Sequence, residues 1–172
     1  MQMSLLNGFM NTMKDDLYAS HLPILAKVVD KSTGPILELG VGYSTLLLHV
    51  MCKQEQRLVV SYETDPVWYE KYRKFETDWH QVKLIRSMND IAMDYMDWGV
   101  VFIDHRPGVN RRTQAIRFRN KAQYILLHDS EPEQNRFFGY QKIYPEFKYV
   151  YHYTKAKPNT AVLSEFRDLS DL

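Results

Sequence analysis

Five short apolar runs, separated by longer amphipathic stretches, constrain the fold of this chain more than any other feature of its sequence. Two of them, Gly99–Ile103 and Tyr124–Leu127, are almost entirely apolar and show no polar face. Strands of this kind, buried on both faces and alternating with helices, are typical of a parallel sheet that helices cover on both sides. The expected strands are Ile36–Leu39, Arg57–Tyr62, Val82–Ile85, Gly99–Ile103 and Tyr124–Leu127.

The end of the chain follows a different pattern. Phe147–Tyr153 and Thr160–Ser164 are two β-rich segments joined by a turn around Pro158, close enough in sequence to pair antiparallel. The sequence therefore predicts an α/β fold with five strand–helix units and a terminal hairpin. The expected helices are Leu22–Asp30, Ser44–Cys52, Pro66–Trp79, Met88–Met96 and Val109–Ala122.

Length and composition indicate one compact domain. The 172 residues are 45% hydrophobic and 25% charged, and no linker, repeat or low-complexity tract interrupts them. We expect a single domain over residues 1–172, in which residues 1–34 form a lid or substrate segment and residues 35–172 form the core. With 22 Lys+Arg against 21 Asp+Glu, the formal charge is +1. This balance favours a small-molecule partner and predicts binding to neither nucleic acid nor a membrane.

Cysteine usage and the absence of targeting signals favour a cytoplasmic protein. Cys52 is the only cysteine, so no intrachain disulfide can form, and its apolar neighbours favour a buried thiol over a nucleophile. We find no pattern of a signal peptide and no apolar run long enough for a transmembrane helix.

The strand ends carry the residues that point to ligand binding. In an open parallel sheet, ligands bind beyond the carboxyl ends of the strands. Four of the five segments at these ends present a carboxylate within their first positions, and two also carry a histidine. The segments are Glu38–Ser44, Glu63–Pro66, Ser87–Asp90, Asp104–Gly108 and His128–Pro132.

The first segment contains a short glycine loop. Gly40 and Gly42 allow a tight turn and close approach of the backbone to a ligand, although they also suit a plain strand-to-helix turn. The loop departs from the dinucleotide-binding fingerprint because Thr45 takes the third glycine position and Glu38 precedes the loop. Glu38 would repel a pyrophosphate and favour an ammonium or sulfonium. Glu63 follows Gly42 by about 20 residues, the spacing of an acidic side chain that binds ribose hydroxyls, or it is a solvated loop carboxylate.

The run Glu38-x-Gly40-x-Gly42-x-Ser44 followed by Glu63 resembles the cofactor motifs of class I, Rossmann-like S-adenosylmethionine-dependent methyltransferases. The terminal hairpin also resembles the antiparallel edge of that family. The resemblance implies a three-layer Rossmann-like sandwich, a seven-stranded sheet of order 3-2-1-4-5-7-6 and S-adenosylmethionine as the cofactor. It places Glu63 on the ribose, Ser87 near the adenine, and Asp104 near the methionine end and the acceptor. The cofactor-binding residues that it implies are Glu38, Gly40, Gly42, Ser44, Glu63, Ser87 and Asp104.

Catalysis of methyl transfer mainly requires alignment of the acceptor, and a base is needed only where the acceptor holds its proton tightly. His128 is the stronger histidine candidate because a buried strand delivers it to the site, although a hydrogen-bonded structural role is equally open. Tyr18 and His21 join the candidates if the N-terminal segment folds over the site. The candidate catalytic residues are Asp104, His105, His128 and Asp129.

A metal is also left open. Some members of the superfamily that methylate hydroxyls bind magnesium or calcium through oxygen ligands after the fourth and fifth strands, and this sequence resembles them in Asp104 and Asp129. It departs from that pattern because His128 stands where a second oxygen donor is expected. Glu131 would have to substitute for it.

Arg106 to Lys121 contains six basic residues and no acidic one. Such a stretch could receive nucleic acid, but we favour a helix face that pairs with carboxylates elsewhere in the chain. Arg106 differs from the rest because it lies at a strand end, where its guanidinium could bind an acidic acceptor.

These features predict an S-adenosylmethionine-dependent methyltransferase that acts on a small molecule, at oxygen or nitrogen. One alternative is an oxidoreductase that binds NAD(P), against which Glu38 and Thr45 count. Another is a methyltransferase-like protein that binds S-adenosylmethionine without transferring its methyl group. Because the core consumes most of the chain, specificity is expected in the N-terminal segment, in the loop after the fifth strand, or in a second subunit of a homo-oligomer.

Overall fold

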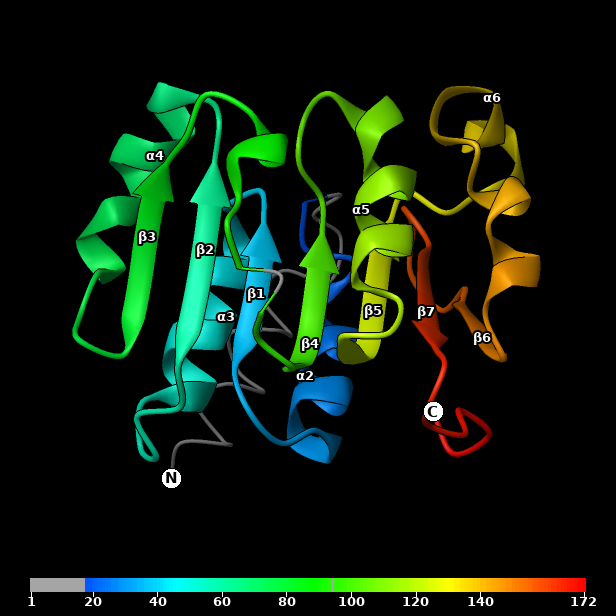
Figure 1. Cartoon of the computed structure of the whole chain (residues 1–172), viewed down its shortest axis with the longest axis horizontal. Coiled ribbons are helices and arrows are strands. Elements are labelled where there is room, and N and C mark those ends of the chain that lie inside the picture. The colour runs from blue at the N-terminus through cyan, green and yellow to red at the C-terminus, as the bar shows by residue number, and fades with distance from the viewer. Residues whose placement is uncertain (1–17, 94) are drawn as a thin grey trace.

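A seven-stranded sheet forms the centre of the molecule (Figure 1), a computed structural model that describes residues 18–93 and 95–172. The strand order is β3-β2-β1-β4-β5-β7-β6, with β1 to β5 parallel and β7 antiparallel to both of its neighbours. This confirms the predicted topology and the terminal hairpin. The strands are β1 (Ile36–Leu39), β2 (Val59–Glu63), β3 (His80–Leu84), β4 (Trp98–Ile103), β5 (Ala122–His128), β6 (Tyr149–Tyr153) and β7 (Thr160–Ser164).

Helices lie on both faces of the sheet, so the molecule has three layers (Figure 1). α2 and α3 pack together on one face, and α5 covers the other face over β4 and β5. The helices are α2 (Leu22–Lys31), α3 (Tyr43–Cys52), α4 (Pro66–Tyr72), α5 (Arg111–Phe118) and α6 (Asn135–Phe138), with 3₁₀ turns at Arg73–Phe75, Met88–Asp90, Gly108–Asn110, Pro132–Gln134, Tyr140–Lys142 and Tyr144–Glu146.

The apolar runs are buried because successive strand residues point to opposite faces, and both faces are covered. In β1, Leu37 and Leu39 join the core under α5, whereas Ile36 joins the core formed with α2 and α3. Glu38 is fully buried with them, which makes it a polar exception inside an apolar strand. No helix among the described residues is long and apolar enough to cross a membrane.

The helix predicted over Met88–Met96 is wrong. In the described part of this segment, a 3₁₀ turn at Met88–Asp90 is followed by irregular chain, so the third strand–helix unit lacks its helix. The reason is local side-chain bonding. Ser87 Oγ accepts from the Asn89 N–H at 3.2 Å, and Asp90 Oδ2 accepts from the Ser87 N–H at 3.1 Å, which favours a turn over helix continuation.

Two other helices are shorter than predicted. α4 ends at Tyr72 and gives way to a 3₁₀ turn, and α5 runs only from Arg111 to Phe118. Neither change moves a strand end. The carboxyl ends of β1 to β5 therefore lie along one edge of the sheet, at the arrowheads in Figure 1, and all five candidate segments follow them.

Candidate cofactor and acceptor site

The two glycines after β1 have different structural roles. Gly40 has a φ of +96°, and a Cβ there would approach the backbone of Asp104 and His105 to 2.8 Å. The fold itself therefore requires glycine at this position. Gly42 has an extended backbone, and the nearest atom to a Cβ there is Ser44 Oγ at 4.0 Å. The fold does not require Gly42, which leaves close approach of a ligand as a reason for it.

Glu38 contacts the glycine loop from inside the protein. Thr45 Oγ1 donates to Glu38 Oε2 at 2.9 Å and accepts from the Gly42 N–H at 3.0 Å. Burial raises the pKa of Glu38 to about 7. The carboxyl group thus holds the loop through Thr45 and does not lie on the surface of the site. Direct contact of Glu38 with a charged ligand stays a prediction.

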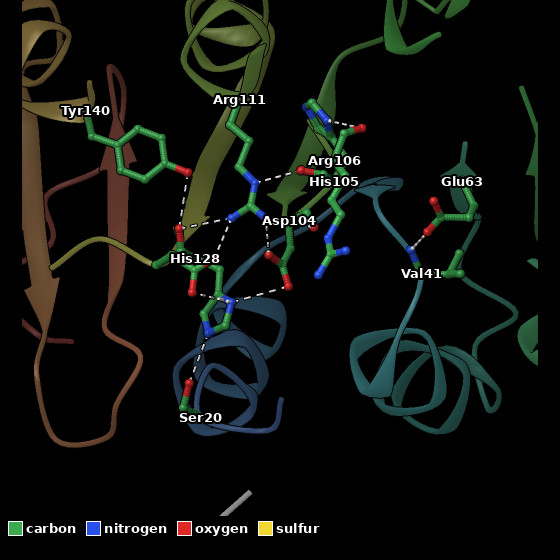
Figure 2. Close-up of polar contacts among 10 residues, drawn as sticks. Ser20, Val41, Glu63, Asp104, His105, Arg106, Arg111, His128 and Tyr140 are labelled. Carbon is green, nitrogen blue, oxygen red and sulfur yellow. Dashed lines mark hydrogen bonds and ion pairs between the residues drawn. The ribbon is translucent and has the colours of Figure 1, made fainter. Parts of the chain in front are cut away.

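Glu63 connects the end of β2 to the glycine loop. Its Oε2 accepts from the Val41 N–H at 2.9 Å, and its Oε1 accepts from the N–H groups of Thr64 at 2.7 Å and Asp65 at 2.9 Å (Figure 2). A carboxylate held by three backbone donors has a fixed position. The structure thus places the acidic side chain predicted for ribose binding directly beside the loop.

Two further predicted cofactor residues lie at this edge. Ser44 is buried in the first turn of α3, and Ser87 begins the 3₁₀ turn beyond β3. Together with Glu63, they follow the adjacent ends of β1, β2 and β3, as the resemblance implies.

A charged cluster, formed by Asp104, Arg111, His128 and Asp129, lies at the ends of β4 and β5 (Figure 2). Arg111 comes from α5 and is 5% exposed. Its Nη2 lies 2.8 Å from Asp104 Oδ1, and its Nη1 lies 2.8 Å from Asp129 Oδ2. Its Nε also donates to the His105 carbonyl at 2.8 Å. The guanidinium therefore joins the two carboxylates predicted for this site.

This arrangement does not fit magnesium or calcium on Asp104 and Asp129. The guanidinium of Arg111 lies between the two carboxylates and binds one oxygen of each, so the pair cannot also enclose a metal ion between them. Glu131, the expected substitute ligand, accepts from the Asn159 N–H at 2.8 Å through Oε1, and its buried Oε2 has no hydrogen-bond partner among the described residues.

His128 donates from both ring nitrogens. Ser20 Oγ donates its single hydrogen to the Pro158 carbonyl at 2.7 Å, so it must accept from His128 Nε2, which lies 3.0 Å away. His128 Nδ1 lies 3.2 Å from Asp104 Oδ2 and 3.7 Å from Asp129 Oδ1, both acceptors. Burial alone would lower the pKa of His128, but the attraction of the Asp104 carboxylate is stronger than this effect and raises that pKa. In this arrangement His128 is an imidazolium, and it cannot accept a proton until it has lost one.

The other two histidines of the region lie differently. The centroid of the His21 ring lies 4.7 Å from that of His128, in an edge-on contact, and 4.7 Å from that of Phe102, in a tilted contact. Burial lowers the pKa of His21 to about 3. Figure 2 shows the His105 ring pointing away from the Asp104 carboxylate, with Nδ1 3.3 Å from the Arg106 carbonyl. The structure therefore brings His21 to the charged cluster and directs His105 elsewhere.

Sequence reasoning missed three contributors to this cluster. It expects the basic run that contains Arg111 to pair with carboxylates elsewhere without identifying them, and it names no role for Tyr140 or Ser20. Tyr140 donates its hydroxyl to the His128 carbonyl at 3.1 Å. Only Arg111 gave a sequence signal, because a run of cations without nearby acids must find its partners in distant segments.

Three other cations of the basic run also have partners within the chain. Arg119 lies 3.5 Å from Glu146 and 3.0 Å from Glu165, and Lys121 lies 3.7 Å from Asp97. Arg119 and Lys121 lie just beyond the end of α5, so for these two residues the predicted pairing with carboxylates elsewhere is found there, although not on the helix itself. The partnered cations of the run are Arg111, Arg117, Arg119 and Lys121.

A cavity of about 610 Å³ opens beside the charged cluster. It lies between the loops that follow β2, β4 and β5, at the edge where an acceptor is expected. Arg106 is exposed there, and among the described residues its guanidinium has no ion pair. The lining residues are Thr64, Arg106, Pro107, Gly108, Arg111, Asp129 and Phe138.

Comparison with known proteins identifies the fold. No protein-family model matches the sequence, and no curated protein matches it. Human methyltransferase-like protein 13 in complex with SAH is 13% identical, with a TM-score of 0.61 over 90% of this chain and 82% of that one. The RNA methyltransferase from Salinibacter ruber in complex with S-adenosyl-L-homocysteine is 13% identical, with a TM-score of 0.55 over 87% of this chain and 95% of that one.

A third similar structure is the hMettl16 catalytic domain in complex with MAT2A 3′UTR hairpin 1. It is 9% identical, with a TM-score of 0.61 over 91% of this chain and 78% of that one. The chain therefore has the fold of class I, Rossmann-like methyltransferases. An NAD(P)-binding oxidoreductase is disfavoured, because the dinucleotide-binding fold has the strand order 3-2-1-4-5-6, without an antiparallel strand inserted next to β5.

Proposed function

We propose that the protein is an S-adenosylmethionine-dependent methyltransferase. The observation that carries the proposal is the link between Glu63 and Val41, which sets an acidic side chain against a glycine loop within a sheet of the methyltransferase strand order. Bound S-adenosylmethionine would supply an activated methyl group on its sulfonium. Proteins of this fold with SAH or S-adenosyl-L-homocysteine bound support the choice of cofactor.

The residues at the ends of β1 to β3 suit this cofactor. The Gly42 backbone is free of a side chain and would allow close approach, and the fixed Glu63 carboxylate has acceptor capacity for ribose hydroxyls. Ser87 would lie on the adenine side. Glu38 and Thr45 would act indirectly, by holding the loop in position.

The acceptor that we propose is a small molecule with an acidic group, methylated at oxygen or nitrogen. The cavity of about 610 Å³ has the size of a small-molecule site. The exposed guanidinium of Arg106 would bind the acidic group, and Phe138 would contact an apolar part.

Alignment of the acceptor would supply most of the rate. Asp104 and Asp129 are both held by Arg111, and His128 carries two protons. The positive and negative charges of the cluster therefore cancel, and its side chains form a fixed side of the site. In this state His128 would hold Asp104 in position and would not deprotonate the acceptor. Asp129, a quarter exposed, is the carboxylate of the cluster that lines the cavity.

RNA is a second candidate acceptor, because two of the similar structures are an RNA methyltransferase and a domain in complex with a 3′UTR hairpin. The charges of this chain give it less support. Most cations of the basic run are paired internally, which leaves few to neutralise phosphates.

Calorimetric titration of the protein with S-adenosylmethionine, S-adenosylhomocysteine and NAD tests the proposed cofactor. We expect the first two to bind and NAD not to bind. Glu63→Gln should weaken S-adenosylhomocysteine binding by about 1–3 kcal/mol, because a charged hydrogen-bond acceptor is lost. Glu76→Gln, at an exposed position, is the control. Binding of NAD alone, or equal affinity of both variants, would contradict the proposal.

The acceptor class is tested by incubation with S-adenosylmethionine labelled in its methyl group. A cell extract is divided into a low-mass fraction and total RNA, and each is offered separately. Label in the low-mass fraction supports the proposed acceptor. Label in RNA alone would overturn that choice and keep the methyltransferase assignment.

A further inference from the structure

We propose that His21, Asp104 and His128 form a binding site for a divalent transition metal such as zinc. The ligand atoms that the three side chains offer all lie within 4.8 Å of one another. They come from the turn before α2 and from the ends of β4 and β5, so the fold assembles the site from three distant segments. The site goes beyond the proposed methyl transfer and does not depend on it.

His21 is the side chain that points to a missing ligand. It is 2% exposed, and neither ring nitrogen has a hydrogen-bond partner among the described residues. A buried donor and a buried acceptor left unsatisfied destabilise the folded state. Its ring lies against the ring of His128, and a metal bound by both would satisfy the free lone pair of His21.

His128 and Asp104 are oriented as metal ligands usually are. A ligating histidine typically donates its other N–H to a fixed acceptor. Here Nε2 of His128 is committed to Ser20, which is held in turn by the Pro158 carbonyl, so Nδ1 faces the site. Arg111 holds Oδ1 of Asp104, which leaves Oδ2 directed at the same point.

Without a second proton on His128, the charged groups of the region sum to −1. Asp104 and Asp129 carry two negative charges, and Arg111 supplies one positive charge. A second proton on His128 brings this sum to zero, and a divalent metal in its place brings it to +1. A proton would leave His21 unsatisfied, whereas a metal ion engages both histidines.

The ligand types select the metal. Two imidazoles and one carboxylate suit zinc, iron or cobalt, whereas magnesium and calcium prefer oxygen ligands throughout. Three protein ligands leave positions open for water or an acceptor group. Asp104 is 26% exposed through its side chain, whereas His21 and His128 are buried, so Asp104 is the ligand on the solvent side of the site.

The test is titration of chelator-treated, full-length protein with zinc chloride in competition with a chromophoric chelator. We expect one tightly bound equivalent, and displacement of zinc by excess magnesium should not occur. His21→Gln should weaken zinc binding at least about tenfold. His80→Gln is the matched control, because His80 is as buried as His21. Its Nδ1 lies 3.3 Å from His49 Nδ1, so these two histidines are the other pair that could bind zinc.

Two outcomes would overturn the proposal: the absence of a tight equivalent in the wild-type protein, or its loss in His80→Gln with retention in His21→Gln. If His21→Gln does not fold, nitrogen NMR of the wild-type histidine rings decides. Zinc should shift the ring signals of His21 and His128 and leave those of His49 and His80 unchanged. The S-adenosylhomocysteine titration on the same samples keeps this result separate from the proposed methyl transfer.

Discussion

The glycine loop and the charged cluster lie at the same edge of the sheet but are built in different ways. The contacts of the loop are mostly short in sequence: Thr45 reaches Glu38 across seven residues, and Glu63 binds the two amides that follow it. Contacts of the cluster span the chain, with Ser20 bonded to His128 across 108 residues. The loop is therefore defined by a local motif, whereas the cluster exists only in the folded protein.

The two regions also depend on different interactions. The loop is held by backbone donors to carboxyl groups, each a modest contribution. The cluster contains buried charges that stabilise one another only while all are present, so removal of one member leaves the others uncompensated. Substitutions at the cluster should accordingly lower the free energy of unfolding by more than substitutions at the loop.

Arg111→Met should have the largest effect. It removes the buried cation that joins Asp104 to Asp129, and breaking a buried ion pair from one side costs about 3–5 kcal/mol. We expect a loss of about 4 kcal/mol in the free energy of unfolding, measured by urea denaturation. Arg112→Met is the control, since Arg112 has no ion pair among the described residues. Equal stability of the two variants would show that the cluster is not a balanced network.

This difference explains what could be predicted from the sequence. The strand order followed from the family resemblance, whereas the candidacy of Glu63 and the glycines followed from short motifs and from the rule that ligands bind beyond strand ends. The partnership of Arg111 with Asp104 and Asp129 did not, because the pairing depends on how α5 packs. The prediction of a helix at Met88–Met96 was wrong because it relied on the spacing of apolar residues and ignored the hydrogen bonds with which Ser87 forms a turn.

Glu38→Gln tests the loop through the pH dependence of stability. The pKa of Glu38 is raised from 4.5 to about 7, so between these values the folded protein binds more protons than the unfolded chain. Its stability should fall as the pH rises through this window, by about 3 kcal/mol in total. Glutamine stays neutral, so the stability of Glu38→Gln should not fall in this window. Above pH about 7 the variant should therefore gain stability relative to the wild type. Unfolding is followed by urea denaturation across the window.

Glu76→Gln serves as the exposed control for that series. It should follow the wild-type pH profile. A Glu38→Gln variant with the same profile would mean that the buried carboxyl group titrates normally, and the positioning role of Glu38 would then lose its physical basis.

Gly40→Ala and Gly42→Ala separate the two functions of the glycine loop, with the smallest expected effect on stability. An alanine at position 40 has an unfavourable positive φ and approaches the Asp104 backbone to 2.8 Å, so we expect a loss of about 2 kcal/mol. An alanine at position 42 meets no atom closer than 4.0 Å in extended backbone, so stability should change by less than about 0.5 kcal/mol.

Binding of S-adenosylhomocysteine should nevertheless weaken in Gly42→Ala, because the Cβ would stand where the ligand approaches. Thermal unfolding and calorimetry on the same two proteins measure both effects. A Gly42→Ala variant that binds the ligand as the wild type does would assign both glycines to the fold alone and leave Glu63 as the main support for the cofactor site.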